Sequence, residues 1–162
     1  MAEPVGEAEF RAAMARFASG VAVVSTRTRH DHAMTANALA SVSLDPPLIL
    51  VCVEMAARFH DAILEAGVWG VSILGKDHRA AATWFASQGR PLVGQFDQTP
   101  HHRGHTGIVL LDDSLATLEC RTFAVHPAGD HAIVVGEVVA VDLADRADAA
   151  LVYYRSRYGS LA

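Results

Sequence analysis

Short runs of apolar and β-branched residues, separated by polar turns, recur along most of this 162-residue chain. Such runs predict buried or half-buried strands. The few segments with helical spacing do not alternate strictly with these runs, as they would in a doubly wound parallel sheet. We therefore predict one mainly β domain over residues 1–162, a β-barrel decorated by short helices. The predicted strands are 21–26, 33–38, 47–53, 68–74, 108–111, 116–125 and 132–141.

Three segments predict short helices. Residues 7–18 place apolar side chains at i, i+4 and i+7, which indicates an amphipathic helix. Residues 58–66 end at Gly67, a residue that favours the left-handed conformation after a helix. The third helix runs to about Ser87, and we expect Asp77 to cap its start. The apolar faces consist of Phe10, Met14 and Phe17 in the first helix and Ala80, Ala81, Trp84 and Phe85 in the third.

Two connecting segments are distinctive. Residues 127–130 predict the turn between the last two strands. Residues 88–107 hold few aliphatic side chains, so we expect a long loop there. Its His101, His102 and His105 are either metal ligands or part of a solvated or subunit-contacting loop. Because no strong set of carboxylates or thiolates accompanies them, we predict no metal site.

Charge and cysteine usage exclude several classes of protein. The chain carries 13 Lys and Arg against 18 Asp and Glu, a net charge of −5, which argues against a nucleic-acid partner. Cys52 and Cys120 lie far apart in apolar runs, as reduced thiols of a cytoplasmic protein do. The N-terminus is polar and acidic, unlike a secretory signal. The longest apolar stretch, 46–53, is far shorter than the roughly 20 residues that span a bilayer, so we expect no membrane segment.

Two polar segments suit a planar, phosphorylated ligand. Residues 34–37 and 41–48 place small polar side chains and unpaired amides between two strands, where they could meet the edge of a heteroaromatic ring. Alternatively, they satisfy loop backbone groups. Residues 54–60 join a strand to a helix, and the free amides there form with Arg58 an anion site that could take a phosphate. The alternative is an ordinary surface helix.

Two further segments could contact a nucleotide. His126 and His131 flank the predicted turn, and residues 153–158 hold phenols and guanidiniums that could stack on and pair with a nucleotide. Alternatively, His126 is a packed strand-end residue and the tail is a dimer lid. The two common nucleotide-binding glycine motifs and the acyl-transfer serine elbow are missing from the sequence.

Together these segments resemble the flavin reductase family of the FMN-binding split barrel, the small reductase component of two-component flavin-dependent monooxygenases. The resemblance runs from about Phe10 to Leu161 and is specific because several motifs occur in the same order and spacing. These motifs are RFASGV at 16–21, MTAN at 34–37, SVSLDPPL at 41–48, LEC at 118–120, GDH at 129–131 and VGEV at 135–138.

The resemblance implies a homodimer of split barrels, each binding FMN or FAD near the subunit interface and reducing it with NADH, with NADPH as a further possible donor. A partner monooxygenase would receive the reduced flavin. The implied contacts are Thr35, Ala36 and Asn37 with the isoalloxazine and ribityl chain; Ser41, Val42 and Ser43 with the polar edge of the ring; the backbone of Cys52 and Val53 with the flavin; Ala57 and Arg58 with the phosphate; and His126, Arg155 and Tyr158 towards the nicotinamide nucleotide.

The implied mechanism needs no acid–base pair, because hydride passes directly between the two cofactors and the protein supplies geometry and electrostatics. We therefore predict no catalytic side chain, and we expect His126 to orient the dinucleotide. Many relatives carry hydroxyl residues where this chain has Ala57 and Phe59, so phosphate binding is either weaker here or carried by other groups. The alternatives are a non-catalytic flavin- or haem-binding barrel and an enzyme like pyridoxamine-phosphate oxidase.

Overall fold

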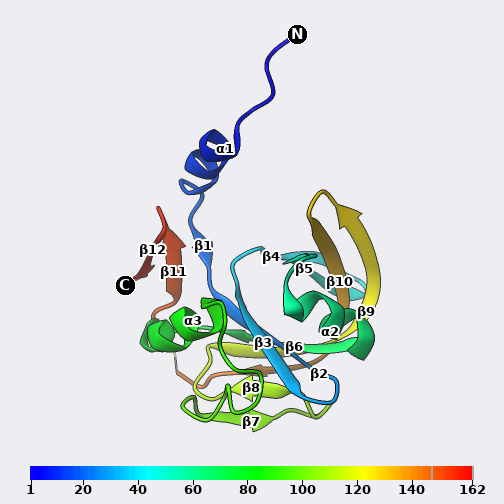
Figure 1. Cartoon of the computed structure of the whole chain (residues 1–162). Helices are drawn as coiled ribbons and strands as arrows, with labels where there is room; N and C mark the ends of the chain where they lie inside the picture. Colours follow the sequence, from blue (N-terminus) through cyan, green and yellow to red (C-terminus); the bar gives the residue numbers. More distant parts are fainter. Residues whose placement is uncertain (147, 162) are drawn as a thin grey trace.

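The computed structural model describes residues 1–146 and 148–161, and all of its paired strands run antiparallel (Figure 1). The predicted domain and tail also include residues 147 and 162, which lie outside the described residues. The helices are α1 (Glu7–Met14), α2 (Arg58–Ala66), the 3-10 helix η1 (Lys76–His78) and α3 (Arg79–Ala86). The strands are β1 (Ser19–Gly20), β2 (Ala22–Arg27), β3 (Asp31–Ala36), β4 (Leu39–Leu44), β5 (Pro47–Glu54), β6 (Val68–Ile73), β7 (His101–Arg103), β8 (Val109–Leu111), β9 (Ala116–Ala128), β10 (His131–Leu143), β11 (Leu151–Tyr154) and β12 (Arg157–Ser160).

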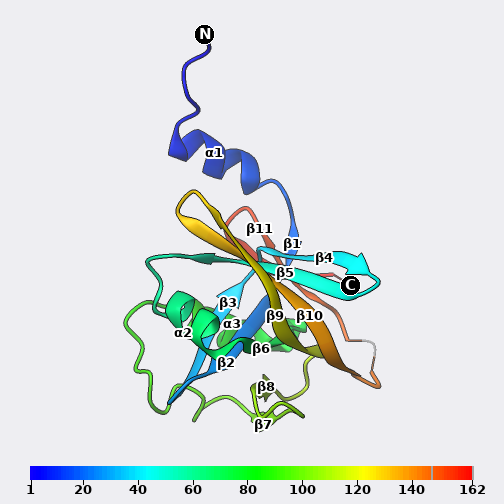
Figure 2. The ribbon, with the colours of Figure 1, turned by 90° about the vertical axis from the view of Figure 1, so that its right-hand side faces the viewer.

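Seven strands form one sheet in the order β3-β2-β6-β9-β10-β5-β4. Its two edge strands, β3 and β4, follow each other in sequence with only Asn37 and Ala38 between them. Such a link spans about 10 Å at most, so the sheet must curl until its edges approach each other at this corner. Figure 2 shows the result, with β4 and β5 crossing β2 and β3 at a steep angle.

Strand β2 separates two apolar layers. Ala22 and Val24 face the inside of the curled sheet, where Phe59 and Ile63 of α2 pack. The alternate residues of β2 face α3 and β8 on the other side. Each layer is therefore built from strands and one helix. The second layer includes Val21, Val23, Ala33, Leu74, Ala82, Phe85, Phe96, Val109, Leu111 and Leu151.

The predicted strands are confirmed as β2, β3, β5, β6, β8, β9 and β10, with ends that move by at most three residues. Helix α2 has the predicted bounds and ends at Gly67 in the left-handed conformation, with φ of 66°. The turn between β9 and β10 is tighter than predicted. Pro127 lies inside β9, and Gly129, with φ of 62°, begins a two-residue loop. A glycine is favoured at such a position because it adopts positive φ without strain.

The first helix differs from the prediction. It ends at Met14 instead of residue 18 and buries no residue within the chain. Its predicted core face is open to solvent, since Phe10 is 60%, Met14 50% and Phe17 74% exposed. Figure 1 shows why: α1 projects away from the body of the molecule, so no other element covers its apolar face.

The third helix also differs at its start and in its buried face. Asp77 lies within η1 and does not cap α3, whose N-cap is His78 without a side-chain hydrogen bond. The buried residues of the helix are Ala82 and Phe85, whereas Trp84 is exposed. Of the predicted apolar face, Phe85 is buried and Ala81 packs against the core, whereas Ala80 is exposed like Trp84.

Several strands were not predicted. Residues 88–107 are not loop throughout, because β7 lies among them and pairs with β8. Residues 41–43 lie in the edge strand β4 instead of between strands. The C-terminal segment forms the hairpin β11–β12, to which β1 adds a third strand. Short edge strands of this kind have little apolar periodicity, so their sequences indicate turns.

Candidate functional site

A cleft of about 530 Å³ lies between β3, the start of α2 and the end of α3 with the segment that follows it. It brings together three predicted site residues that are distant in sequence: Thr35, Ala57 and Arg58. The fold explains this convergence. Strand β5 is followed by α2, whose apolar face packs against β2 and the edge strand β3.

The start of α2 is one wall of the cleft. Strand β5 ends at Glu54, and a short turn follows in which the Ala57 N–H donates to the Glu54 carbonyl oxygen at 3.0 Å. Ala57 is the N-cap, and no side chain caps the helix. The first backbone N–H groups of a helix have no partner within it and carry partial positive charge. This wall of the cleft can therefore donate hydrogen bonds to an anion.

Two guanidiniums share the cleft. Nη1 of Arg58 donates to the carbonyl oxygen of Arg90 at 3.3 Å, which links α2 to the segment after α3. Burial lowers the pKa of Arg90, and the neighbouring charge of Arg58 lowers it further. The two cations line the same cleft, so an anion bound there would interact favourably with both.

His32 lies at the inner side of the same cleft and is only 9% exposed. Its Nε2 is hydrogen bonded to the Thr28 hydroxyl at 3.0 Å. Burial lowers the pKa of His32, and the charges of Arg58 and His30 lower it further, against the opposite effect of Asp31. The ring is therefore neutral at pH 7 and does not add to the positive charge of the cleft.

The predicted ring-binding residues on β3 have different environments. The Thr35 hydroxyl donates to the Ala82 carbonyl oxygen of α3 at 2.6 Å, so only its oxygen lone pairs remain free to accept. Ala36 is buried in the interior layer, and Asn37 is exposed at the corner that follows β3. Side-chain hydrogen bonds at this edge can therefore come from Asn37, while Thr35 fixes the strand against α3.

The remaining predicted flavin contacts lie on β4 and β5. Ser41 and Ser43 flank a register shift in the pairing of these strands, and Val42 between them is exposed. Cys52 is half-buried, and its N–H donates to the Ala38 carbonyl oxygen at 3.0 Å. Val53 is fully buried in the core, so any ligand contact that it makes uses its backbone.

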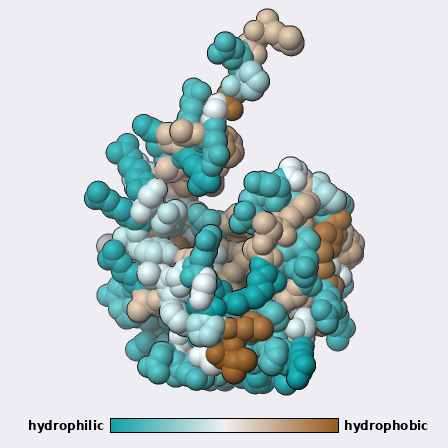
Figure 3. All heavy atoms as spheres, viewed as in Figure 1, coloured by the Kyte–Doolittle hydropathy of each residue, from teal (hydrophilic) through white to brown (hydrophobic). Residues whose placement is uncertain are grey.

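His126, Arg155 and Tyr158 do not line the cleft. His126 is exposed on β9, opposite Ile133 of β10. Arg155 and Tyr158 belong to the β11–β12 hairpin and line a separate groove of about 680 Å³. Figure 3 shows a notch at the top of the molecule, between the column of α1, β11 and β12 and the lobe of β4, β5, β9 and β10. Within one chain the predicted flavin and nicotinamide contacts are therefore not joined.

The hairpin tip holds Arg155 in an unusual backbone conformation. Arg155 and Ser156 have φ of 48° and 60°, and the Arg155 guanidinium lies 5.4 Å from the centre of the Tyr154 ring. Tyr153 and Tyr158 pack with ring centres 5.4 Å apart. Burial raises the pKa of Tyr158, and Tyr153 raises it further, so this phenol is protonated and can donate a hydrogen bond.

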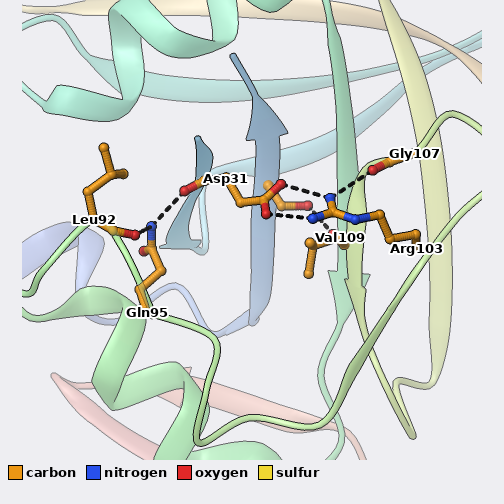
Figure 4. Close-up of polar contacts among 7 residues, drawn as sticks. Asp31, Leu92, Gln95, Arg103, Gly107 and Val109 are labelled. Atoms are coloured by element: carbon orange, nitrogen blue, oxygen red, sulfur yellow. Dashed lines mark hydrogen bonds and ion pairs between the residues drawn. The ribbon is translucent and has the colours of Figure 1, made fainter. Parts of the chain in front are cut away.

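The segment after α3 is fastened to the β2–β3 hairpin by polar side chains (Figure 4). Arg103 of β7 donates two hydrogen bonds to the Asp31 carboxylate, at 2.8 and 2.7 Å, and one to the Gly107 carbonyl oxygen at 2.9 Å. The Gln95 amide donates to the carbonyl oxygens of Asp31 and Leu92 at 2.9 and 3.1 Å. These contacts anchor residues 95–103, which follow the cleft-lining residues 85–90 in the chain.

A buried carboxylate fixes the turn before β8. Glu119 of β9 is 3% exposed and accepts hydrogen bonds from the N–H groups of His105 at 2.8 Å and Thr106 at 2.7 Å, and from the Thr106 hydroxyl. Burial raises the pKa of Glu119, but these hydrogen bonds lower it by more, so the pKa lies below its usual value. The carboxylate is therefore charged at neutral pH.

The three histidines of this region do not converge. Nδ1 of His101 is hydrogen bonded to the Thr99 carbonyl oxygen and Nδ1 of His102 to the Asp112 carboxylate. Among residues 1–146 and 148–161, no three His, Cys, Asp or Glu side chains are placed to hold a metal ion. None of the described helices has the length and hydropathy of a bilayer-spanning segment.

Comparison with known protein families matches residues 14–162 to the flavin reductase like domain. The chain belongs to the flavin reductase family. Among curated relatives of this reductase, the NADH-dependent flavin reductase of a Rhodococcus species is 39% identical over 149 residues, which cover 85% of this chain and 82% of the relative. The reductase component of 4-hydroxyphenylacetate 3-monooxygenase from Thermus thermophilus is 39% identical and covers 94% of this chain and 95% of the relative.

Solved structures of flavin reductases have the same fold. BorF, the flavin reductase component of a bacterial two-component tryptophan halogenase, has a TM-score of 0.91 and 42% identity, covering 96% of this chain and 98% of BorF. The NADH:FAD oxidoreductase SgcE6 of Streptomyces globisporus, solved with NAD and FAD fragments, has a TM-score of 0.92 and 32% identity, covering 99% and 98%. The predicted family and the predicted flavin reductase activity are confirmed.

Two residues of the reductase cleft were not predicted. Arg90 lies in a segment that indicated only a loop, and His32 lies in a turn-like run of polar residues. No sequence signal connects Arg90 with Arg58, because a separation of 32 residues matches no helical or strand periodicity. Only the approach of α3 to β3 brings the two guanidiniums together.

Proposed function

We propose that this flavin reductase transfers hydride from NADH to FMN or FAD and supplies the reduced flavin to a partner oxygenase. The curated and solved relatives support the proposal, since their names describe NADH-dependent reduction of FMN or FAD and reductase components of oxygenases. The observation that carries it on this chain is the cleft in which Thr35, Ala57 and Arg58 meet.

The residues of the cleft fit a phosphorylated flavin. An uncapped helix start and two guanidiniums offer hydrogen-bond donors and positive charge for a phosphate. The corner at Asn37 leads from this cleft to β4, where small polar side chains present an edge without bulk. The proposed flavin contacts are Thr35, Ala36, Asn37, Ser41, Val42, Ser43, Cys52, Val53, Ala57 and Arg58.

A bound flavin supplies an acceptor for hydride, and the protein orients it. Backbone and side-chain donors at the polar edge of the ring would stabilise the negative charge that develops there. His126, Arg155 and Tyr158 are proposed to position the nicotinamide nucleotide, and none of them needs to transfer a proton. Orientation dominates the rate, because reacting atoms must approach to about 3 to 3.5 Å.

We further propose that the curled sheet is a split barrel that works as a homodimer. Two observations support this proposal: the apolar face of α1 is exposed, and His126 lies apart from Arg155. A second copy of the chain could cover the apolar face and bring its own Arg155 close to His126 of the first copy. Analytical ultracentrifugation tests it. The chain should sediment as a dimer, and Phe17→Ser should shift it towards monomer, whereas a monomeric wild type would contradict the proposal.

The activity is tested by following NADH oxidation by the purified protein with and without FMN, FAD or riboflavin. Rapid oxidation that depends on added flavin is expected, and the ratio of rates defines the flavin preference. Replacing NADH by NADPH defines the preferred donor. A yellow protein that does not oxidise NADH would instead indicate a flavin-binding module, and this outcome would contradict the proposed function.

A further inference from the structure

The tip of the β11–β12 hairpin has a backbone conformation that its sequence does not favour. Tyr154 pairs with Arg157, so Arg155 and Ser156 alone form the turn, and both have positive φ, of 48° and 60°. A two-residue hairpin turn with positive φ at both positions usually holds Asn-Gly, because a side chain at positive φ crowds the neighbouring backbone. Among residues 1–146 and 148–161, the only other non-glycine residue with positive φ is Asp113. The chain therefore keeps a strained turn where a glycine would relieve the crowding.

Contacts at the tip and at the base of the hairpin hold this conformation. The Arg155 N–H donates to the carbonyl oxygen of Ala15, the residue after α1, at 2.8 Å. The Arg155 guanidinium lies 5.4 Å from the centre of the Tyr154 ring, a distance at which a cation is attracted to the ring face. At the base, Tyr153 and Tyr158 pair across the two strands and pack against the second apolar layer. The backbone and the side chain of Arg155 are therefore both held in place without a ligand.

The groove beside this tip is positively charged. Arg155 and Arg157 line it together with Tyr154 and Tyr158, and no carboxylate of the described residues does. Nor does either guanidinium form an ion pair in the part of the chain that the structure describes. Two cations beside aromatic rings suit a ligand that carries phosphates and flat rings. A nicotinamide dinucleotide has both.

Ser156 itself does not line the groove, so the role of its strained backbone must be indirect. Strained residues persist where the surrounding structure holds them, and they cluster at ligand-binding sites. A glycine at position 156 would reach the same φ without crowding, but it would also let the turn adopt many other conformations. Conformational freedom that Arg155 has before binding is lost on binding, and this loss weakens the affinity. A side chain at position 156 therefore narrows the turn at a cost in stability.

We propose that Ser156 is a positioning residue, which restricts the turn so that the Arg155 guanidinium meets the dinucleotide in a preformed position. This inference rests on the proposed function, in which Arg155 contacts the nicotinamide nucleotide. It adds a residue that acts only through Arg155. Ser156 should therefore affect the binding of the dinucleotide, but neither the binding of flavin nor the turnover rate once both ligands are bound.

The test compares Ser156→Gly and Ser156→Asn with the wild type. Calorimetric titration of the FMN-saturated protein with NAD⁺ gives the dinucleotide dissociation constant without reducing the flavin. Ser156→Gly should weaken NAD⁺ binding about three- to tenfold, because the freed Arg155 side chain must be ordered on binding. The KM for NADH should rise by a similar factor, with kcat and the flavin dissociation constant within about twofold of the wild type. Ser156→Asn should bind NAD⁺ like the wild type, because asparagine tolerates positive φ but is less free than glycine.

Melting temperatures test the strain itself. Ser156→Gly should melt at the temperature of the wild type or a few degrees above it, because the crowding at positive φ is relieved. The matched control is Asp113→Gly, at φ of 57° in the turn between β8 and β9. It relieves the same kind of crowding away from the hairpin, so it should leave NAD⁺ binding unchanged.

Unchanged NAD⁺ binding by Ser156→Gly, in a protein that oxidises NADH, would overturn the proposal and leave the proposed function intact. Equal losses for Ser156→Gly and Ser156→Asn would overturn it as well, since the hydroxyl and not the backbone would then matter. A lower melting temperature of Ser156→Gly would show that the turn is not strained and would remove the basis of the proposal. A wild type that neither binds NAD⁺ nor oxidises NADH would refute the proposed function together with the role of Ser156.

Discussion

Glu119→Gln should destabilise the protein by about 3 kcal/mol at pH 7. The carboxylate accepts from two N–H groups and one hydroxyl, and a hydrogen bond to a charged group contributes about 1.5–3 kcal/mol. Glutamine keeps one acceptor oxygen but turns an NH₂ group towards these donors, so we expect the loss of one to two such bonds. For a domain of this size, 3 kcal/mol lowers the melting temperature by about 6–12 °C.

The pH dependence of this effect is fixed by the pKa of Glu119. Because hydrogen bonding lowers that pKa in the folded state, the stabilisation is fully present above the ordinary glutamate pKa of 4.5 and is lost as the pH falls through the lowered pKa. Urea unfolding of the wild type and Glu119→Gln should therefore differ most near pH 7 and converge in acid.

The matched control for this experiment is Glu137→Gln, an exposed carboxylate on the neighbouring strand β10. It should change the free energy of unfolding by less than about 0.5 kcal/mol. An equally small change for Glu119→Gln at pH 7 would contradict the argument. A difference that persists undiminished in acid would show that the carboxylate charge is not its source.

Three further predictions concern the dinucleotide, the core and the ion pair between β3 and β7. His126→Ala should raise the KM for NADH several-fold and leave the flavin dissociation constant within about twofold, and steady-state kinetics with fluorescence titration checks this. Gly136→Ala should lower the free energy of unfolding by about 1–3 kcal/mol or more in urea, because an added Cβ would collide with the Trp69 ring. Gly159→Ala, with open space around it, should lower it far less. The Asp31–Arg103 pair should show a coupling free energy of about 1 kcal/mol at most in a double-mutant cycle, reduced by salt, since both side chains are partly exposed.

The sequence predicts the central strands and α2 well because their apolar periodicity and their packing agree. Helix α2 shows this: its apolar face packs inside the curled sheet, and Gly67 ends it where the sequence expects. The same periodicity misleads for α1. Its face is as regular, yet among the residues that the structure describes none covers Phe10 or Phe17, which stay exposed. Periodicity predicts that a helix has an apolar face but not whether another element of the chain covers that face.

The site is predictable only where its residues lie on regular elements. Thr35 and Arg58 follow strand and helix signals, and the structure brings them into one cleft. Arg90 carries no such signal, because its place depends on how α3 lies against β3. His126 and Arg155 lie on separate hairpins, β9–β10 and β11–β12, whose relative position no periodic signal in the sequence predicts.

The burial of β2 on both faces determines how the molecule opens. Its amides pair with β3 on one side and β6 on the other, and its residues from Ala22 to Thr26 are all buried. Neither apolar layer can loosen without exposing a face of this strand, so we expect its amides to exchange hydrogen only when the whole domain unfolds. The walls of the cleft include the edge strand β3 and residues 85–90, and we expect their amides to exchange through smaller, local openings. Motion that admits a ligand can therefore occur at β3 and at the segment after α3 while β2 and its two apolar layers stay folded.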